Sequence, residues 1–209
     1  MISKSIQNAI ERLAKLPGIG PRHAARIAFY LLKESKKEVE NFADHLKALK
    51  ERVRTCPVCF LSFEPVRQDQ KACDICTNAK RSKTAICVVE KETDVEAIEK
   101  TGLFKGVYHV VGENVDTLDK TTSASVKRLL DRIAYIKKQL TAKKQPEMEV
   151  ILATNATTEG EALSSYLKKL IKPLGVNISR LGRGLSSGTE LEYADQHTLA
   201  SAFENRKPR

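Results

Sequence analysis

The sequence predicts an α/β protein with three successive parts: helices joined by a tight hairpin, a small four-cysteine module, and a parallel-sheet domain with a C-terminal extension. Three observations support this. Helical periodicity flanks the glycine-rich segment 16–21, two Cys-x-x-Cys pairs fall within 56–76, and strands alternate with helices from Ile86 onward. Such alternation is typical of a parallel sheet with helices packed on its faces.

Three helices are predicted near the N-terminus, over residues 5–15, 22–33 and about 38–53, because apolar residues recur there at spacings of three and four. The apolar residues concerned are Ile6, Ala9, Ile10 and Leu13, then Ala25, Ile27, Ala28, Leu31 and Leu32, then Phe42, Leu46 and Leu49.

The segment between the first two helices resembles a helix-hairpin-helix. Gly18 and Gly20 flank Ile19, which permits a tight turn with outward N–H groups, while Ile19 itself is expected to pack into the helix pair. The next helix adds unpaired N–H groups and the positive end of its dipole. Arg22 and Arg26 are one helical turn apart and project on the same side. We interpret these five residues as a seat for DNA phosphates; the alternative is a plain turn between helices.

Four of the five cysteines have the spacing of a metal site. Cys56 and Cys59 form one pair, and Cys73 and Cys76 form a second pair 13 residues later. Four thiolates satisfy tetrahedral Zn²⁺ without an open position, so we expect one structural zinc ion per chain. An iron–sulfur cluster and a redox dithiol are the alternatives. A loop this short has little core of its own, so the metal is expected to stabilise it.

The charge distribution favours a polyanionic partner. The chain has a net charge of +10, and residues 1–55 alone hold 12 basic and 6 acidic side chains, against 19 and 17 in residues 86–209. A basic N-terminal part could bind DNA by counterion release, although a solubilising charge is the plain alternative. No apolar run has the length of a membrane span, and the N-terminus does not resemble a signal peptide. We therefore expect a cytoplasmic protein with no membrane partner.

The parallel sheet is predicted from four buried-type strands. The strands are expected at 86–89, 107–111, 150–153 and 176–181, and the helices between them at about 93–100, 122–141 and 159–171. Cys87 lies within the first strand and is expected to be a buried apolar side chain, not a fifth metal ligand.

Acidic residues at two strand ends resemble the motifs of a Toprim domain, which topoisomerases, primases and certain nucleases share. Glu90 follows the first strand, and Glu159 and Glu161 follow the third. The resemblance implies that two aspartates should precede Glu159 to help hold Mg²⁺, but Asn155 and Thr157 occupy those positions. Without these charges a hard divalent cation lacks ligands, which argues against cleavage of DNA.

The surviving acidic residues also have a structural interpretation. Thr158 with Glu161, and Thr93 with Glu96, have the spacing of capping boxes at helix starts. Glu90 and Glu159 fit either role, because both are placed at the carboxyl end of a parallel sheet, where α/β folds bind their ligands.

Hairpin, cysteine module and Toprim-like domain in this order resemble the bacterial RecR family over nearly the whole chain. Further segments that carry the resemblance are Ile86-Cys87-Val88-Val89-Glu90, Tyr108-His109-Val110, Ile151-Leu152-Ala153-Thr154-Asn155 and Leu191-Glu192-Tyr193-Ala194-Asp195. It implies four regions: a DNA-binding helix-hairpin-helix domain at 1–54, a zinc finger at 55–78, a Toprim domain at 79–176 and an oligomerisation segment at 177–209. One departure concerns residues 112–124, which lack the glycine-rich linker that is usual in the family.

The resemblance also implies a function. Members of the family are non-enzymatic mediators that act with RecO, and in some settings RecF, to load RecA onto gapped or single-stranded DNA. They form ring-shaped tetramers with exchanged terminal segments. Arg22 and Arg26 match DNA-contacting positions, and Glu90 and Glu159 match acidic positions tied to partner binding. Two other functions stay open: a metal-dependent phosphotransferase or nuclease of the Toprim kind, and a scaffold that binds only proteins.

Overall fold

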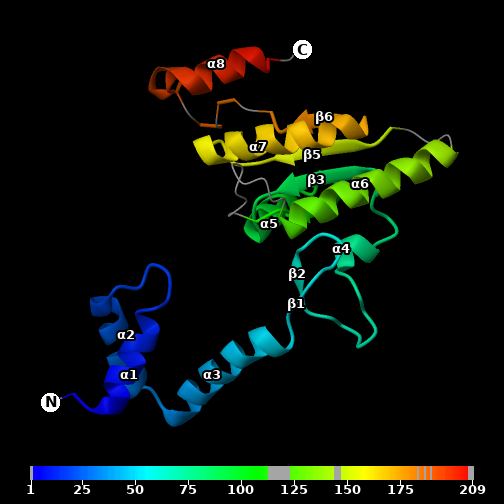
Figure 1. The fold of residues 1–209 in the computed structure, drawn as a ribbon. Coiled ribbons are helices and arrows are strands. Elements are labelled where there is room, and N and C mark those ends of the chain that lie inside the picture. The colour runs from blue at the N-terminus through cyan, green and yellow to red at the C-terminus, as the bar shows by residue number, and fades with distance from the viewer. Residues whose placement is uncertain are drawn as a thin grey trace. The chain divides into compact units, whose positions relative to one another are not determined.

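The computed structural model describes residues 2–112, 123–143, 147–182, 184–185, 187–188 and 190–206. It separates into two compact units, Met1–Arg54 and Thr55–Arg209 (Figure 1). No helix of the described ranges is long and apolar enough to cross a membrane.

The N-terminal unit consists of the three predicted helices, with ends shifted by one or two residues. They are α1 (Lys4–Leu13), α2 (Pro21–Lys33) and α3 (Lys36–Glu51). Serine side chains cap two of the helices: Ser3 accepts from the N–H of Ile6 at 3.5 Å, and Ser35 from that of Glu38 at 3.2 Å. These bonds satisfy N–H groups that the first turn of a helix leaves free.

A four-stranded parallel sheet forms the centre of the second unit, with strand order β4-β3-β5-β6. The strands confirm the predicted α/β class. They are β3 (Ala85–Val89), β4 (Val107–Val110), β5 (Glu149–Ala153) and β6 (Asn177–Arg180). β3 and β5 lie inside the sheet, and β3 is almost wholly buried, which explains its unbroken apolar sequence.

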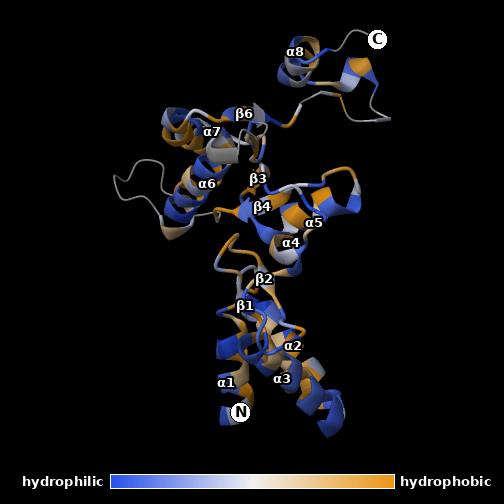
Figure 2. Ribbon diagram, turned by 90° about the vertical axis from the view of Figure 1, so that its right-hand side faces the viewer, coloured by the Kyte–Doolittle hydropathy of each residue, from blue (hydrophilic) through white to orange (hydrophobic). Residues whose placement is uncertain are grey.

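Each face of the sheet carries its own apolar core. Ile86 and Val88 of β3 belong to a cluster with α6 (Ala124–Lys143) and α7 (Thr158–Ile171). The alternate residues Cys87 and Val89 belong to a second cluster with α5 (Glu92–Lys100). Figure 2 shows α6 and α7 on one side of the sheet and α5 on the other. Cys87 is therefore buried as predicted, and burial raises the pKa of its thiol to about 12.

Short elements complete the second unit. Before the sheet come β1 (Arg54–Thr55), β2 (Ser62–Phe63) and α4 (Asp74–Thr77); after α7 come η1 (Lys172–Leu174), η2 (Leu191–Tyr193) and α8 (Gln196–Glu204). Asp195 caps α8 by accepting from the N–H of Thr198 at 2.9 Å. The loop predicted to depart from the family pattern lies for the most part outside the described residues, since 113–122 are not among them.

Candidate metal centre, hairpin and acidic strand ends

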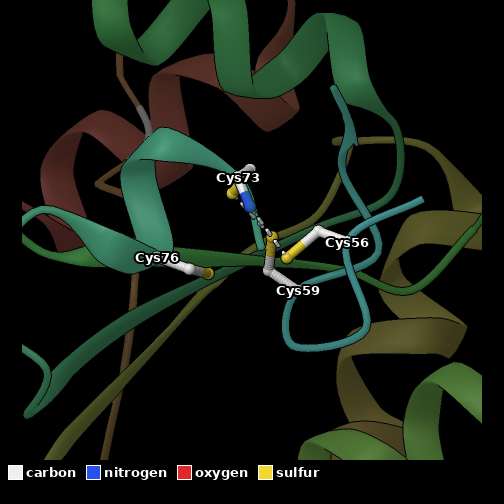
Figure 3. Close-up of side chains that lie close together, drawn as sticks. All are labelled: Cys56, Cys59, Cys73 and Cys76. Atoms are coloured by element: carbon white, nitrogen blue, oxygen red, sulfur yellow. Dashed lines mark hydrogen bonds between the residues drawn. The ribbon is translucent and has the colours of Figure 1, made fainter. Parts of the chain in front are cut away.

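Four cysteine side chains converge in the second unit. The sulfur atoms of Cys56, Cys59, Cys73 and Cys76 all lie within 4.8 Å of one another, and Figure 3 shows the four side chains directed toward a common centre. The Sγ atoms of Cys59 and Cys73 are 3.5 Å apart, too far for a disulfide, and all four thiols are free. Three of the four are fully buried and Cys76 is partly exposed.

Local backbone structure places the first pair. The N–H of Phe60 donates to the carbonyl of Cys56 at 2.9 Å, and the N–H of Cys56 donates to the carbonyl of Leu61 at 2.9 Å. Phe60 has a φ of 63°, a left-handed conformation that closes this tight knuckle. Both thiols of the pair are thereby directed inward.

The short helix α4 places the second pair. Cys73 is its N-cap, and the N–H of Thr77 donates to the Cys73 carbonyl at 3.0 Å. At the other end, the Lys83 ammonium donates to the carbonyls of Cys76 and Asn78 at 2.9 and 2.8 Å. Lys83 thus satisfies carbonyl groups that the end of a helix leaves free, and burial lowers its pKa.

The close approach of the four thiols opposes the ionisation of all four together. Donation from Cys59 and its neighbours lowers the pKa of Cys56. The same hydrogen bonding with Cys56 raises the pKa of Cys59 and of Cys76, because each would add a negative charge beside an existing thiolate. A divalent ion at the centre would remove this repulsion. Four sulfur donors without an open position suit a structural metal, so these cysteines could hold a metal ion.

The cysteine module also packs on the sheet, which sequence analysis missed. The N–H of Val110 donates to the carbonyl of Cys59 at 2.8 Å, and the rings of Phe60 and His109 are 5.6 Å apart. His109 is fully buried, and burial lowers its pKa to about 4, so its ring is neutral at pH 7. Its Nε2 lies 2.9 Å from the carbonyl of Ser125 and donates to it. The module therefore has stabilising contacts besides those that a bound metal would supply.

The hairpin between α1 and α2 is a tight turn with an open outer face. The N–H of Ile19 donates to the carbonyl of Leu16 at 3.1 Å, and Gly18 has a φ of 76°, which favours glycine. Gly20 is the N-cap of α2. A side chain added at Gly18 or Gly20 would meet nothing within 4 Å, so the space beside both residues is free. Ile19 is half-buried.

Groups able to bind an anion are available at this hairpin. The first backbone bond into α2 comes from the N–H of Ala24, which donates to the Gly20 carbonyl at 2.9 Å. The N–H groups of Arg22 and His23, which precede it, have no acceptor within the described part of the chain. Arg22 and Arg26 are exposed, and neither has an ion-pair partner among the described residues. The hairpin thus offers N–H groups and two guanidinium groups together.

The acidic residues at the strand ends differ from the hairpin groups, because most of their carboxylates already form hydrogen bonds or ion pairs within the protein. Glu90 is 8% exposed, and its Oε1 accepts the N–H of Asn155 at 2.6 Å. Glu161 forms two hydrogen bonds with Arg180 of β6, at 2.7 and 2.6 Å. Glu159 is exposed on the first turn of α7. Arg180 lies at the end of the last strand, and nothing local in the sequence indicated this pairing.

Both predicted capping boxes are wrong in position. The N-cap of α7 is Thr157, not Thr158, and its hydroxyl accepts from the N–H of Gly160 at 3.1 Å. The cap of α5 also comes earlier than predicted. There Asp94 accepts from the N–H of Lys91 at 3.0 Å.

Each helix begins where its cap bond forms: at Thr157, whose hydroxyl accepts from the N–H of Gly160, and at Lys91, whose N–H donates to Asp94. Glu161 and Glu96 consequently take part in ion pairs. Glu161 pairs with Arg180, and Glu96 pairs with Lys100 at 2.7 Å.

The four cysteines and the acidic residues at the strand ends therefore differ in their ability to hold a metal ion. Across the described residues, the four cysteines are the only group of three or more His, Cys, Asp or Glu side chains placed to hold a metal. The structure brings Glu90 and Asn155 together, but among those same residues it does not gather the acids of the strand ends into such a group.

Comparison with known proteins agrees with this arrangement of parts. Residues 6–50 match the family model described as "RecR, helix-hairpin-helix", residues 84–182 match "Toprim domain", and residues 184–207 match "RecR, C-terminal". Three curated relatives, each named "Recombination protein RecR", align over nearly the whole chain.

The relative from Dehalococcoides mccartyi (strain 195) is 41% identical, over 97% of this chain and 94% of its own. The relative from Thermobifida fusca is 42% identical, over 99% and 98%. The relative from Chlorobaculum tepidum is 42% identical, over 98% and 97%.

Proposed function

This chain belongs to the RecR family of recombination proteins, and from that premise we propose that it binds DNA as a non-enzymatic mediator of recombinational repair. The observation that carries the proposal is the hairpin, where backbone N–H groups and two arginines without ion-pair partners in the described ranges face open space. Such a site binds phosphates through charge-assisted hydrogen bonds and contacts no base edge. Binding would be independent of sequence, and DNA as ligand places the protein in the cytoplasm, at the nucleoid.

We propose that the cysteine centre holds one structural Zn²⁺ ion. Two Cys-x-x-Cys pairs with four convergent sulfur atoms are the donor set of structural zinc sites. Cys56, Cys59, Cys73 and Cys76 would be the ligands. With no coordination position left for water or substrate, the ion would stabilise residues 55–78 and take no part in a reaction.

The acidic strand ends are proposed to serve a protein partner. Glu159 is exposed and negatively charged, so it suits a basic surface such as one on RecO and would repel DNA. Glu90 is buried, so it would not contact the partner directly. It would position the backbone at Asn155 by accepting its N–H. We propose RecO as this partner, with RecF as a second, and loading of RecA onto gapped or single-stranded DNA as the outcome.

A homo-oligomer, proposed as a ring tetramer, is supported by exposed apolar side chains in the terminal regions. In the N-terminal unit they include Tyr30, Leu32, Phe42, Leu46 and Leu49, and in the C-terminal segment Leu191, Tyr193 and Phe203. Phe42, Leu46 and Leu49 share one face of α3, and an exposed apolar helix face is typical of interfaces. We propose that residues 1–54 bind DNA and that residues 177–209 mediate oligomerisation. The Toprim domain at 79–176 lies in the sequence between the zinc module and this C-terminal segment.

The proposal is tested by the salt dependence of DNA binding. Removal of a single phosphate-binding group should flatten the slope of log K against log salt by about 0.7 to 0.9. A variant with Arg22→Ala and Arg26→Ala should therefore have a slope shallower by about 1.4 to 1.8 for each subunit that contacts the DNA, and its binding should weaken on all sequences alike.

The matched control removes two exposed lysines of α3, Lys37→Ala and Lys50→Ala, which subtracts the same net charge from the same unit. Its slope should change far less. An arginine variant with the wild-type slope and affinity would show that the hairpin is only a turn between helices.

A further inference from the structure

The two sides of the sheet differ in charge, although the domain as a whole is nearly balanced. α6 carries six basic residues and one acidic residue, whereas α5 carries four acidic residues and one basic residue. The two helices cover opposite faces of the sheet (Figure 2). The α6 side is therefore a basic surface within a domain whose average charge does not reveal it.

Only part of this basic charge is used inside the protein. Arg132 donates to the carbonyl of Tyr108 at 2.8 Å, and Lys137 donates to that of Gly175 at 2.8 Å. Lys127, Arg128 and Lys138 are exposed or partly exposed and have no ion-pair partner in the ranges that the structure describes. These three cations are available to an external anion.

Of these three cations, Arg128 lines a groove where α6 meets the first cysteine knuckle. This knuckle groove has a volume of about 400 Å³ and is lined by Pro57, Val58, Arg128, Asp131, Arg132 and Tyr135. Tyr135 is 66% exposed, so most of its ring is accessible. Arg128 and Tyr135 are two helical turns apart on one face of α6, a separation of about 10 Å along the axis.

We propose that the knuckle groove binds single-stranded DNA. An unpaired base would stack on Tyr135 against the apolar wall of Pro57 and Val58, while Arg128 and Lys138 bind the flanking phosphates. This inference rests on the proposed function, since it adds to the hairpin a second DNA contact that is specific for single strands. In a duplex the bases are stacked and paired, so none could reach the tyrosine ring.

Charge complementarity favours a nucleic acid over an acidic peptide. Lys127, Arg128 and Lys138 extend along α6 beyond the groove, so a continuous polyanion could contact all three. One carboxylate in the groove would meet only Arg128 and Arg132, of which Arg132 already donates to the Tyr108 carbonyl, and it would also face Asp131. A strand of DNA carries its phosphates along the helix and places only a base beside that aspartate.

The test compares the affinity of full-length variants for oligo(dT) and for a blunt duplex of equal length. Tyr135→Ala removes the stacking platform for one base, so it should weaken binding of oligo(dT) at least about fivefold. Duplex affinity should change less than about twofold, because duplex bases do not stack on the ring. Tyr135→Phe should keep the wild-type affinity, since the ring persists. Circular dichroism melting should confirm that these exposed substitutions leave the fold intact.

A charge-matched pair completes the design. Arg128→Glu should weaken oligo(dT) binding more than Arg67→Glu, because Arg67 is also accessible but lies on the loop between the two cysteine pairs, outside the groove. Equal effects of the two reversals would overturn the inference, because they would show long-range electrostatics alone.

The outcome also separates this inference from the proposed function. If the Arg22→Ala, Arg26→Ala variant no longer binds DNA while Tyr135→Ala binds oligo(dT) like wild type, the groove is not a DNA site but the function stands. If Tyr135→Ala keeps its affinity for oligo(dT) and no longer binds a poly-glutamate peptide, the groove is a protein site and the inference is wrong. If wild type itself binds neither oligo(dT) nor the duplex, the proposed function is wrong, and this inference is wrong with it.

Discussion

The cysteine centre and the acidic strand ends are both groups of ionisable side chains beside the same sheet, yet their surroundings are opposite. The four thiols converge on one another, and the nearby Lys83 ammonium, which donates to backbone carbonyls, carries one positive charge against four negative ones. At the strand ends, Glu90 accepts a backbone N–H and Glu161 is paired with Arg180. The first arrangement is suited to an external cation, whereas the second has internal partners instead.

This comparison shows that ligand identity alone does not define a metal site. A carboxylate that accepts a short hydrogen bond or pairs with an arginine has less to offer a cation, since each lone pair is used once. Asn155 and Thr157 reduce the negative charge of the strand ends further.

Loss of the metal should have the largest effect. Structural zinc contributes about 10 to 16 kcal/mol in small zinc modules, so Cys56→Ser or a strong chelator should unfold residues 55–78. Elemental analysis and circular dichroism melting would measure zinc content and unfolding. The matched control is Cys87→Ala, which should keep one zinc and destabilise the fold by about 1 kcal/mol, because Cys87 lies in the apolar core. A fully folded, metal-free Cys56→Ser protein would contradict the account.

The second-largest effect is expected from Gly160→Ala, which should destabilise the acidic strand ends. A Cβ at Gly160 would overlap the backbone carbonyl of Asn155, which cannot move aside easily. Overpacking of this kind costs about 1 to 3 kcal/mol of unfolding free energy, measurable by urea denaturation. Gly182→Ala is the control, because a Cβ there meets nothing within 4 Å. Equal stability of the two variants would show that this turn is loosely packed.

Replacement of Glu90 distinguishes a hydrogen-bond acceptor from a metal ligand. Glu90→Ala leaves the N–H of Asn155 without its acceptor and should cost about 1 to 3 kcal/mol. Glu90→Gln retains an acceptor oxygen and should keep most of the stability. Urea denaturation of the two variants tests this, and equal destabilisation in both would mean that the negative charge, not the hydrogen bond, is what matters.

The ion pair at the edge of the sheet should contribute least. Glu161 and Arg180 are both partly exposed, so Glu161→Gln should lower the unfolding free energy by less than about 1 kcal/mol. Glu159→Gln is the companion variant, since Glu159 has no ion-pair partner among the described residues, and its thermal unfolding should match wild type. Greater destabilisation at Glu159 than at Glu161 would contradict the described pairing.

Sequence periodicity and spacing were sufficient for the three N-terminal helices, for the four strands of the sheet with the helices between them, and for the convergence of the cysteines. The short elements β1, β2, α4, η1 and η2 and the helix α8 were not predicted. The unbroken apolar run of β3 and the two Cys-x-x-Cys pairs are local signals, because each depends on residues close together in the chain. The turn at Gly18 is likewise local, and its positive φ agrees with the choice of glycine.

The partners of the acidic residues could not be predicted, because they depend on the placement of distant elements. Arg180 meets Glu161 only because β6 lies next to β5, and Asn155 meets Glu90 across 65 residues. Contact of Phe60 with His109 depends in the same way on how the cysteine module packs. The charge of α6 was visible in the sequence, but its separation from α5 by the sheet was not.

The most direct test of the contrast is a single assay for binding and cleavage together. Supercoiled DNA is incubated with highly purified protein and Mn²⁺, and each sample is divided between a retardation gel and a denaturing step that reveals nicks. The account predicts retarded DNA that remains supercoiled after the protein is removed. Mn²⁺-dependent nicking that is present in wild type and absent in Glu90→Gln would contradict it, because the acidic strand ends would then hold a catalytic metal after all.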